Sequence, residues 1–337
     1  MKLSRVRVGA VAGSLILGTL ALSGGGASAK AITQVTFAYD FPGPDFELVP
    51  LVVAQHRGYF ARAGLHVKIV FPPNTSTTTQ MLSVGTADIG MLTTSDMVIA
   101  VGAGAPVLSV ANYSMHNNWG LFALPGTSLS ASTLKSTLKG KRIFSYGDTW
   151  TESMLPFILR YAGLTTSQVK IVTDPTGYDL TFLLSHRVDF STNTNNYELP
   201  GWAGSGKSGH LSELLGTKAG APDVPIWTYA VTRAYANAHG ATVKAFLSAV
   251  KKATVWAAAN PAAAAGEFDM TYPKSGYSDA YNKLGWSLTV PILTNSSGQY
   301  FTQTSAQWTS LARALKGIKL ITKVAAPSTY YTNKYQP

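Results

Sequence analysis

The chain is 337 residues long, carries a formal net charge of +11 and contains no cysteine. The charge reflects few carboxylates (16) against 27 lysines and arginines, and no basic run is longer than Lys251-Lys252, so the sequence does not indicate nucleic-acid binding. Without disulfides an exported domain must rest on its hydrophobic core, and this chain is long enough to build one or two.

The low number of carboxylates also bears on the environment of the protein. Only 13% of the residues are charged, whereas serine, threonine, asparagine and glycine are abundant. Paired or buried carboxylates lose their contribution to stability when they are protonated, so a surface that is poor in them favours an acidic external milieu. A stability maximum above about pH 7, with collapse near about pH 4, would contradict this expectation.

Residues 1–29 are predicted to be a cleaved secretory signal. Lys2, Arg5 and Arg7 form its basic start, residues 8–22 form its apolar run, and Ala27-Ser28-Ala29 is a small-residue cleavage site. An uncleaved membrane anchor is the alternative, but glycines interrupt the apolar run, which is shorter than the roughly 20 residues of a spanning helix. Lipid attachment requires a cysteine at the cleavage site, so we expect a periplasmic or secreted protein without a lipid anchor.

The chain then alternates between short strands and helices, which is the pattern of a doubly wound α/β lobe. Val52, Tyr59 and Phe60 fit one helix face, and Gly64 and Gly85 lie where helix C-caps are expected. The predicted elements are a strand at 34–39, a helix through 52–61, a strand at 66–71, a Thr-rich helix ending at 85, a strand at 87–92, a helix at 94–102 and a strand at 105–113.

A polar and aromatic stretch, 114–120, interrupts this pattern and is predicted to cross into a second lobe. The elements predicted there are a strand at 121–124, a helix at 132–138, a strand at 142–146, a helix at 151–162, a strand at 169–172, a helix at 178–185 and a strand at 189–194. An exposed loop rich in glycine and serine is predicted at 205–210, and the return crossing at 225–229.

The C-terminal part is predicted to be helical and to rejoin the first lobe. A long helix at 241–259 is indicated by an apolar face, Asn260-Pro261 ends it, and an Ala-rich helix and a final helix at 306–315 follow. The predicted fold is therefore α/β, with two doubly wound lobes joined by a two-strand hinge. Lobe 1 comprises residues 30–118 and 228–337, and lobe 2 comprises residues 119–227. Two crossings between lobes are typical of a hinged binding protein.

The sequence offers few residues for catalysis. It lacks a cysteine nucleophile, a Gly-x-Ser-x-Gly motif and a His-x-x-x-His metal spacing. No acid, base and oxyanion donor are brought together by any motif. We therefore predict no enzyme activity, no catalytic residue, no metal ion and no cofactor, with a secreted enzyme kept as an alternative.

A binding function has more support. The loops expected at the carboxyl ends of the strands combine aromatic residues with amides and carboxylates, which can hold a flat heterocycle by stacking and by hydrogen bonds to its edge. These loops contain no arginine or lysine, which a fixed anion would require, so a neutral or cationic ring is favoured over a sulfonate or nitrate. The predicted ligand-binding residues are Asp40, Phe41, Ser95, His116, Asn117, Trp119, Tyr146, Asp148, Trp150, Thr151, Glu152, Asn195, Tyr197 and Glu198.

Each kind of side chain has an expected role. Stacking is assigned to Trp119, Tyr146 and Trp150, acceptance of ring or amine N–H groups to Asp40, Asp148 and Glu198, and contacts with the rest of the ring edge to Asn117 and Asn195. Two structural alternatives stay open. Residues 149–152 can form an ordinary helix cap through Thr149 or Thr151, and Trp119 can simply pack the hinge.

Several motifs resemble those of one known family. Arg57-Gly58-Tyr59-Phe60, Gly64-Leu65 and Gly85–Gly90 resemble a pattern of the solute-binding proteins of ABC importers, within the branch that takes in thiamine pyrimidine precursors, nitrate and alkyl sulfonates. Residues 115–122 resemble the Met-His-Asn segment of the thiamine-precursor members, and Tyr146-Gly147 followed by Glu152 resembles their Tyr-Gly turn and helix start.

This resemblance implies a periplasmic binding protein of type II, a monomer that delivers a small-molecule ligand to an ABC importer permease and meets the membrane only through that transporter. The implied ligand is a heterocycle like a thiamine pyrimidine precursor. An alkyl-sulfonate (taurine) or nitrate binder, a secreted pyrimidine enzyme and a structural surface protein are the alternatives. The chain departs from the family in its first loop, which lacks the usual Pro-Asn segment. It also lacks the cysteine-rich iron motif of the related pyrimidine synthases, which argues against an enzyme.

Overall fold

The computed structural model describes residues 32–73, 76–175 and 178–337, so the predicted signal at 1–29 lies outside the described residues. The alternation of strands and helices that the sequence predicts is confirmed. None of the helices in these described ranges is long and apolar enough to cross a membrane.

A five-stranded sheet forms the first of two α/β regions and has the order β2-β1-β3-β10-β4. β1 pairs in parallel with β2 and β3, whereas β10, which enters from the distant C-terminal half, is antiparallel to β3 and β4. Every residue of β3 and β4 is buried, as expected of strands covered on both faces. The strands are β1 (Thr33–Ala38), β2 (Leu65–Val70), β3 (Ile89–Thr93), β4 (Val107–Asn112) and β10 (Trp227–Thr232).

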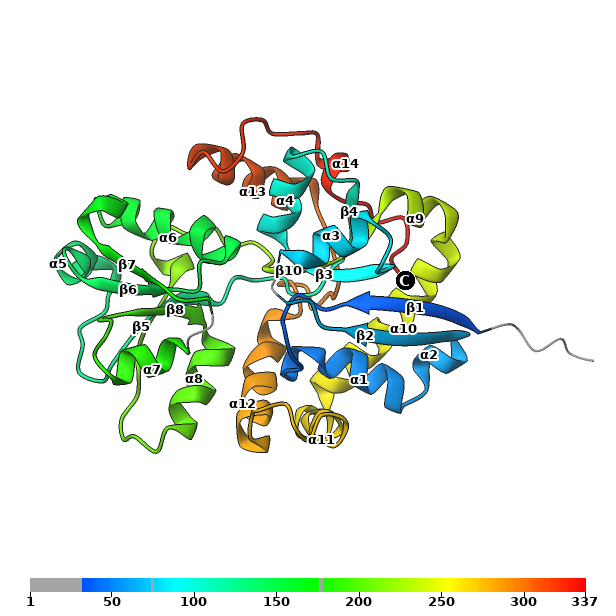
Figure 1. Cartoon of the computed structure of the whole chain (residues 1–337), viewed down its shortest axis with the longest axis horizontal. Coiled ribbons are helices and arrows are strands. Elements are labelled where there is room, and N and C mark those ends of the chain that lie inside the picture. The colour runs from blue at the N-terminus through cyan, green and yellow to red at the C-terminus, as the bar shows by residue number, and fades with distance from the viewer. Residues whose placement is uncertain (1–31, 74–75, 176–177) are drawn as a thin grey trace, which may run out of the picture. The chain divides into compact units, whose positions relative to one another are not determined.

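Helices cover both faces of this sheet, with α1, α2 and α10 on one face and α3 and α4 on the other (Figure 1). Phe37 of β1 points toward α10, where its ring stacks on Phe246 with 5.7 Å between centroids. The bounds are α1 (Val49–His56), α2 (Tyr59–Arg62), α3 (Thr77–Ser83), α4 (Thr94–Gly102), α9 (Arg233–Ala238), α10 (Gly240–Ala259), α11 (Pro261–Thr271), α12 (Asp279–Thr289), α13 (Ser305–Gly317) and α14 (Pro327–Tyr330), with the short 3₁₀ turns η1 (Phe46–Leu48) and η5 (Val290–Ile292).

The second region has a three-stranded sheet, β8-β5-β9, and a parallel pair, β6-β7. The pair continues the sheet because a parallel bridge joins Ile143 to Phe190, and the Phe144 N–H donates to the Phe190 carbonyl at 2.8 Å. The strands are β5 (Trp119–Ala123), β6 (Arg142–Ser145), β7 (Lys170–Thr173), β8 (Ser191–Thr194) and β9 (Ser212–Leu215).

The helices of this region again lie on two sides of the strands, with α5 and α6 on one side and α7 and α8 on the other (Figure 1). A separate apolar cluster that includes Phe122, Phe144 and Phe182 packs on the side of α7 and α8, whereas α5 and α6 belong to the main core through Leu134 and Ile158. The helices are α5 (Leu134–Leu138), α6 (Thr149–Tyr161), α7 (Asp179–Leu184) and α8 (Asn195–Gly204), and the 3₁₀ turns are η2 (Ala131–Thr133), η3 (Thr166–Gln168) and η4 (Gly216–Lys218).

The two regions, called the first and the second lobe below, are connected by segments 113–118 and 219–226. These segments run beside each other. The Tyr113 N–H donates to the Trp227 carbonyl at 2.9 Å, and Ser114 Oγ accepts from the Ile226 N–H at 3.0 Å. Closer to the second lobe, the Asn117 N–H donates to Asp223 Oδ1 at 3.0 Å. Within the residues that the structure describes, the chain passes between the two sheets only at these two paired segments.

The predicted elements differ from the structure in instructive places. The helix predicted through 52–61 is two helices, because Gly58 adopts the left-handed conformation with φ 64°. The long helix predicted at 241–259 is confirmed as α10, and Pro261 starts α11 after Asn260 ends it. Helices α8 and α12 were not predicted. Pro200 interrupts the pattern of α8, and the buried face of α12 is made of Asn282, Gly285, Trp286 and Thr289, which give little apolar signal apart from the tryptophan.

Candidate functional site

The segments that follow the strands of the two lobes contact each other directly. Asn196 Nδ2, at the start of α8 in the second lobe, donates to Glu47 Oε1 in the first lobe at 3.1 Å and to Thr289 Oγ1 at 2.9 Å. The Tyr197 hydroxyl donates to Asp45 Oδ2 at 2.8 Å. The Phe46 ring lies 4.7 Å from the Tyr197 ring, centroid to centroid. These contacts place the loop after β1 against the helix after β8.

Three buried carboxylates in the loop after β1, Asp40, Asp45 and Glu47, form what we call the carboxylate cluster. Asp45 Oδ1 accepts from the Tyr39 hydroxyl at 2.6 Å and from the Glu47 N–H at 2.9 Å. Among the described residues, the ion pairs lie elsewhere: Arg57 with Glu267, His116 with Asp223 and Arg142 with Asp189. The cluster is therefore held by hydroxyl and amide donors and not by a cationic side chain.

Burial dominates the electrostatics of this cluster. It raises the pKa of Asp45 to about 6, although hydrogen bonds from Tyr39 and Tyr197 act in the opposite direction. Burial, followed by repulsion from Asp45, also raises the pKa values of Asp40 and Glu47 well above the ordinary range. A carboxylate that is desolvated without a counter-ion is costly, and a positive charge placed beside it would lower that cost.

A second acidic pair lies where α4 of the first lobe approaches α6 of the second. Thr93 caps α4 by accepting from the Asp96 N–H at 3.0 Å, and it donates to Asp96 Oδ2 at 2.6 Å. Asp148 caps α6 by accepting from the Thr151 N–H at 2.8 Å. Burial, with a smaller contribution from the Asp148 carboxylate, raises the pKa of Asp96 to about 6, so the two groups lie near each other across the lobes. Asp40 is repelled by both Asp45 and Asp96 and therefore lies near both acidic groups.

Four unpaired polar atoms also lie at this junction. They are among the ten buried side-chain nitrogen and oxygen atoms that have no hydrogen-bond partner in the described ranges, and they stand at helix starts or strand ends: Ser95 Oγ, Asn118 Oδ1, Trp150 Nε1 and Thr194 Oγ1. An unpaired buried donor or acceptor costs about 1–3 kcal/mol, which a ligand that supplies the missing partner would recover.

Several predicted site residues lie at this junction. Asp40, Ser95, Trp150 and Thr151 are buried there, and Phe41, Asp148, Asn195 and Tyr197 are partly buried. The Phe41 and Tyr197 rings, which come from different lobes, are 6.4 Å apart, centroid to centroid. Asn195 Oδ1 accepts from Asn118 Nδ2 at 2.9 Å.

Other predicted residues have evident structural contacts. Trp119 opens β5 inside the main core, and Asn117 joins the two connecting segments through Asp223 and the Pro222 carbonyl. His116 pairs with Asp223 at 3.0 Å on the surface, and Glu152 is exposed on α6. Their roles toward a ligand stay predictions.

Tyr146 and Glu198 belong to a third group inside the second lobe. Tyr146 packs on Phe144 with 4.9 Å between ring centroids, and its hydroxyl lies 3.5 Å from the Asp179 N–H. Glu198 is buried and accepts from the Ser191 hydroxyl at 2.5 Å. Burial, followed by the Asp179 carboxylate, raises the pKa of Glu198 well above its ordinary range. Besides burial and Tyr277, the carboxylates of Asp45, Asp179 and Glu198 raise the pKa of Tyr281 in α12. The group formed by Tyr146, Asp179 and Glu198 therefore lies near the first lobe as well.

One local prediction is wrong. The cap of α6 is Asp148, and neither Thr149 nor Thr151 fills that position. The aspartate accepts directly from the helix N–H groups because it stands one residue before the first helical residue.

Sequence reasoning missed Asp45, Glu47, Asp96, Asn118 and Asn196. Asp96, Asn118 and Asn196 directly adjoin predicted residues, whereas Asp45 and Glu47 lie four and six positions after Phe41. The signal that could have found Asp45 and Glu47 is the density of carboxylates in the loop at 40–47. What the sequence does not reveal is that Asn196 crosses to Glu47, 149 positions away along the chain.

Gly201, Gly206, Lys207 and Ser208 have the spacing of a phosphate-binding loop, Gly-x-x-x-x-Gly-Lys-Ser. That motif requires a strand before the loop and a helix N-terminus after it. Here the glycines lie at the end of α8 and in the turn beyond it, where a helix presents carbonyl groups. The fold therefore gives this segment no phosphate-binding geometry.

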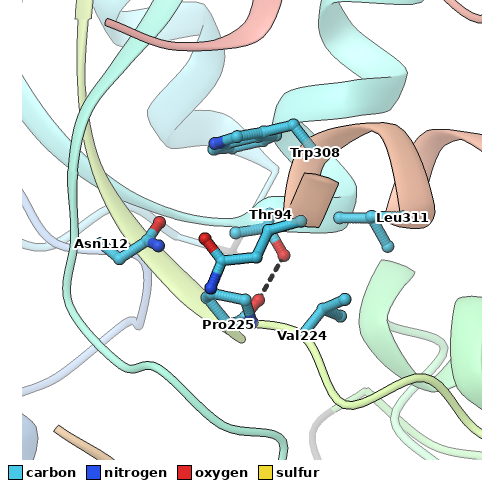
Figure 2. Close-up of a pocket in the computed structure, with 7 residues that line it drawn as sticks. Thr94, Asn112, Val224, Pro225, Trp308 and Leu311 are labelled. Atoms are coloured by element: carbon cyan, nitrogen blue, oxygen red, sulfur yellow. Dashed lines mark hydrogen bonds between the residues drawn. The ribbon is translucent and has the colours of Figure 1, made fainter. Parts of the chain in front are cut away.

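Two hollows elsewhere do not share the features of the junction. The first, behind the return segment, has a volume of about 10 Å³, room for one water molecule at most, and the Thr94 hydroxyl donates to the Pro225 carbonyl beside it at 2.5 Å (Figure 2). It is lined by Thr94, Asn112, Val224, Pro225, Gln307, Trp308 and Leu311. The second is an open hollow of about 340 Å³ at the far end of the second lobe, lined by Leu124, Pro125, Leu184, His186, Trp202, Lys207 and Ser208. Across the described parts of the chain, no group of three or more histidines and carboxylates is placed to hold a metal ion.

Comparisons with known proteins place the chain among relatives of two kinds. It is 30% identical over 115 residues to a 4-amino-5-hydroxymethyl-2-methylpyrimidine phosphate synthase of Saccharomyces cerevisiae, a match covering 34% of this chain and 33% of the yeast protein, so the match spans about a third of that relative. It is 26% identical over 292 residues to a Haemophilus influenzae protein named for thiamine biosynthesis, covering 83% of this chain and 86% of the relative.

Among solved structures, the alkanesulfonate-binding protein SsuA of Xanthomonas axonopodis bound to MOPS aligns with a TM-score of 0.67 at 18% identity, covering 90% of this chain and 99% of SsuA. This likeness confirms the predicted fold class, a two-lobed α/β periplasmic binding protein fold of type II. The family described as NMT1/THI5 like matches residues 45–264, more than half of the chain. The chain therefore belongs to the NMT1/THI5-like family.

Proposed function

We propose that this protein is an extracytoplasmic solute-binding protein of an ABC importer and that it captures a small amino-substituted heterocycle, like a thiamine pyrimidine precursor, between its two lobes. The lobes would be residues 30–118 with 228–337 and residues 119–227, hinged at the paired connecting segments. The observation that carries the proposal is the group of four unpaired buried polar atoms beside buried carboxylates, at the strand ends and helix starts where the lobes meet.

The chemistry of this junction suits an aminopyrimidine. Carboxylate and amide oxygens accept from exocyclic amino groups, and the Trp150 Nε1–H can donate to a ring nitrogen. Phe41 and Tyr197, partly exposed and on different lobes, are positioned to contact a flat ring. The relatives named for thiamine biosynthesis and for pyrimidine phosphate synthesis support the same ligand class.

An alkyl sulfonate, taurine or nitrate is the second candidate, supported by the structural likeness to the alkanesulfonate-binding protein SsuA bound to MOPS. A sulfonate would need donors, and a cationic side chain is the strongest. No lysine or arginine in the described residues bonds to the carboxylate cluster, so an anion would meet repulsion there. An enzyme is the third candidate, since the yeast relative is a synthase.

Titration calorimetry and thermal shift of the mature protein would test the proposal against 4-amino-5-hydroxymethyl-2-methylpyrimidine, riboflavin, taurine, ethanesulfonate and nitrate. We expect stabilisation by the pyrimidine and none by the anions. A shift with a sulfonate and with no ring would overturn the proposed ligand class. Conversion of the pyrimidine or its phosphate by the purified protein would replace the binding function with an enzymatic one.

The remaining parts of the proposal concern location and partners. We propose a monomer that works in the periplasm or outside the cell and hands its ligand to the permease. Sizing the purified protein and locating it by cell fractionation would test both statements. A dimer, or a protein that stays in the cytosolic fraction, would contradict them.

A further inference from the structure

We propose that lobe closure is coupled to the charge of the guest, with Asp45 and Glu47 as the specificity residues. At neutral pH these two carboxylates allow the lobes to close on a positively charged guest. They disfavour closure on an anion and closure of the empty protein. This inference rests on the proposed interlobe site, and it goes beyond it by assigning the charge of the ligand and the residues that select it.

The first argument is where these carboxylates find their partners. Asp45 and Glu47 belong to the first lobe, but Tyr197 and Asn196 of the second lobe supply one hydrogen bond to each, at 2.8 Å and 3.1 Å. Asp45 is 0% and Glu47 1% exposed. Any separation of the lobes would break these two hydrogen bonds and return both carboxylates to water. Closure therefore carries the desolvation cost of these charges.

The second argument is the absence of a counter-charge on the elements around Asp45 and Glu47. The titratable groups that face the two carboxylates are Tyr39 and Asp40 after β1, Tyr113 after β4, Tyr229 of β10, Tyr197 of α8, Tyr277 before α12 and Tyr281 in α12. Each of these is neutral or acidic. The carboxylates of neighbouring α11 are engaged elsewhere, Glu267 with Arg57 and Asp269 with Asn282. The compensating charge must come from a guest or from protons.

The third argument is an unpaired acceptor in the same network. Asn118 is 4% exposed, and its Nδ2 donates to Asn196 Oδ1 at 3.0 Å, so it is linked through Asn196 to Glu47. Asn118 Oδ1 has no partner in the described parts of the structure. The unsatisfied atom of this network is thus an acceptor beside carboxylates, and the complementary guest offers N–H donors and a positive charge: a primary amine, an amidine or a protonated aminopyrimidine.

Protonation of the two carboxylates should have the same effect as a positively charged guest. Burial raises the pKa of Asp45 to about 6, and it also raises the pKa of Glu47 well above its ordinary value. Below these values the two groups are neutral, and the desolvation cost of closure falls. The empty protein should then close in acid, where no guest charge is needed.

Small-angle scattering of the mature protein, combined with calorimetry, tests the inference. The probes are 4-amino-5-aminomethyl-2-methylpyrimidine, whose amine is cationic, its neutral 5-hydroxymethyl analogue, and ethanesulfonate. At about pH 7.5 we expect compaction with the cation, a weaker effect with the neutral analogue and none with the anion. We expect the empty protein to become more compact as the pH falls from about 7.5 to about 5.

The variants Asp45→Asn and Glu47→Gln should be more compact than the wild type when empty at neutral pH, and their preference for the cationic over the neutral pyrimidine should fall about 10-fold. Asp279→Asn removes an exposed carboxylate at the start of α12 and should change neither property. Two variants are used so that a folding defect in one of them, which circular dichroism would reveal, does not decide the result.

The outcomes separate the inference from the proposed function. If pyrimidines bind but both variants keep the wild-type charge preference, the inference is overturned and the function stands. If no probe binds, the proposed ligand fails, while acid-driven compaction of the empty protein, absent from Asp45→Asn, would still support charge-coupled closure. An empty protein whose dimensions do not respond to pH would overturn the inference.

Discussion

The Tyr197 hydroxyl donates a hydrogen bond of 2.8 Å to Asp45 Oδ2, and these two residues belong to different lobes. The same tyrosine ring packs on Phe46, the residue after Asp45, with centroids 4.7 Å apart. The Tyr197 side chain thus makes both a polar and an aromatic contact at the junction. The ring can stay packed when the hydroxyl is removed, so the polar contribution can be measured separately.

Tyr197→Phe should destabilise the protein by about 1–2 kcal/mol, because it leaves Asp45 with one hydroxyl donor fewer in a buried setting. It should also weaken binding of an amino-pyrimidine by about 5-fold, since less free energy then favours the closed arrangement. Urea unfolding and calorimetry measure the two effects. Tyr161→Phe, at a side chain that is 54% exposed, is the matched control and should have little effect on either. Equal effects from both substitutions would argue against the interlobe hydrogen bond.

Stability of the empty protein should fall as the pH rises from about 4 to about 7. The pKa values of Asp45 and Asp96 in the folded chain are both about 6, raised from 3.8 by burial. A raised pKa means that the folded state binds more protons, so the stabilisation is complete below the unfolded value and is lost as the pH passes the folded value. Each group contributes on the order of 3 kcal/mol.

Thermal unfolding between about pH 4 and pH 8 checks this prediction, with the Asp45→Asn variant as the comparison. The variant should show a shallower decline, because one of the two groups no longer titrates. A melting temperature that rises steadily from pH 5 to pH 8 would contradict the assignment, and it would also count against adaptation to an acidic milieu.

Trp150→Phe removes an indole N–H that has no partner among the described residues. The substitution loses ring volume but also removes an unsatisfied buried donor, which offsets about 1–3 kcal/mol of the cost. Trp286→Phe is the matched comparison, because Trp286 Nε1 donates to the Ala257 carbonyl at 3.2 Å. We expect Trp286→Phe to be the more destabilising of the two in urea unfolding.

The same pair separates stability from binding. Trp150→Phe should weaken binding of the amino-pyrimidine by about 5- to 10-fold through the lost hydrogen bond. Trp286→Phe should leave the affinity nearly unchanged, because its indole lies in the core between α10 and α12. Unaltered affinity in Trp150→Phe would remove this tryptophan from the site.

Gly285→Ala tests the packing of α12 against the loop that carries Asp45 and Glu47. An added Cβ would lie 2.5 Å from Phe46 Cε1, so the ring or the helix must shift. We expect a loss of about 1–3 kcal/mol in unfolding free energy. Gly266→Ala in α11 meets nothing within 4 Å, and it should stabilise the protein by about 0.5–1 kcal/mol. If both substitutions lower the unfolding free energy, the loss in Gly285→Ala cannot be assigned to the Phe46 contact.

Much of the fold could be predicted from local patterns. The apolar face and the Asn260-Pro261 stop of α10 are encoded within one helix, and the alternation of short strands with glycine-ended helices indicates the α/β class. Helix α8 was missed because Pro200 and its polar residues hide it, and its stability comes instead from packing against α12. Local signals succeed where an element's own residues decide its conformation.

The candidate site was predictable only in part. The sequence by itself determined which loops carry carboxylates, amides and aromatic rings, because strand ends and helix caps are local features. Only the tertiary structure decided that Asp45 and Glu47 are buried against Tyr197 and Asn196, that Trp119 packs into the core and that Glu152 is exposed. The physical reason is that burial and charge pairing depend on which segments meet in space, and Asn196 and Glu47 meet across 149 positions of chain.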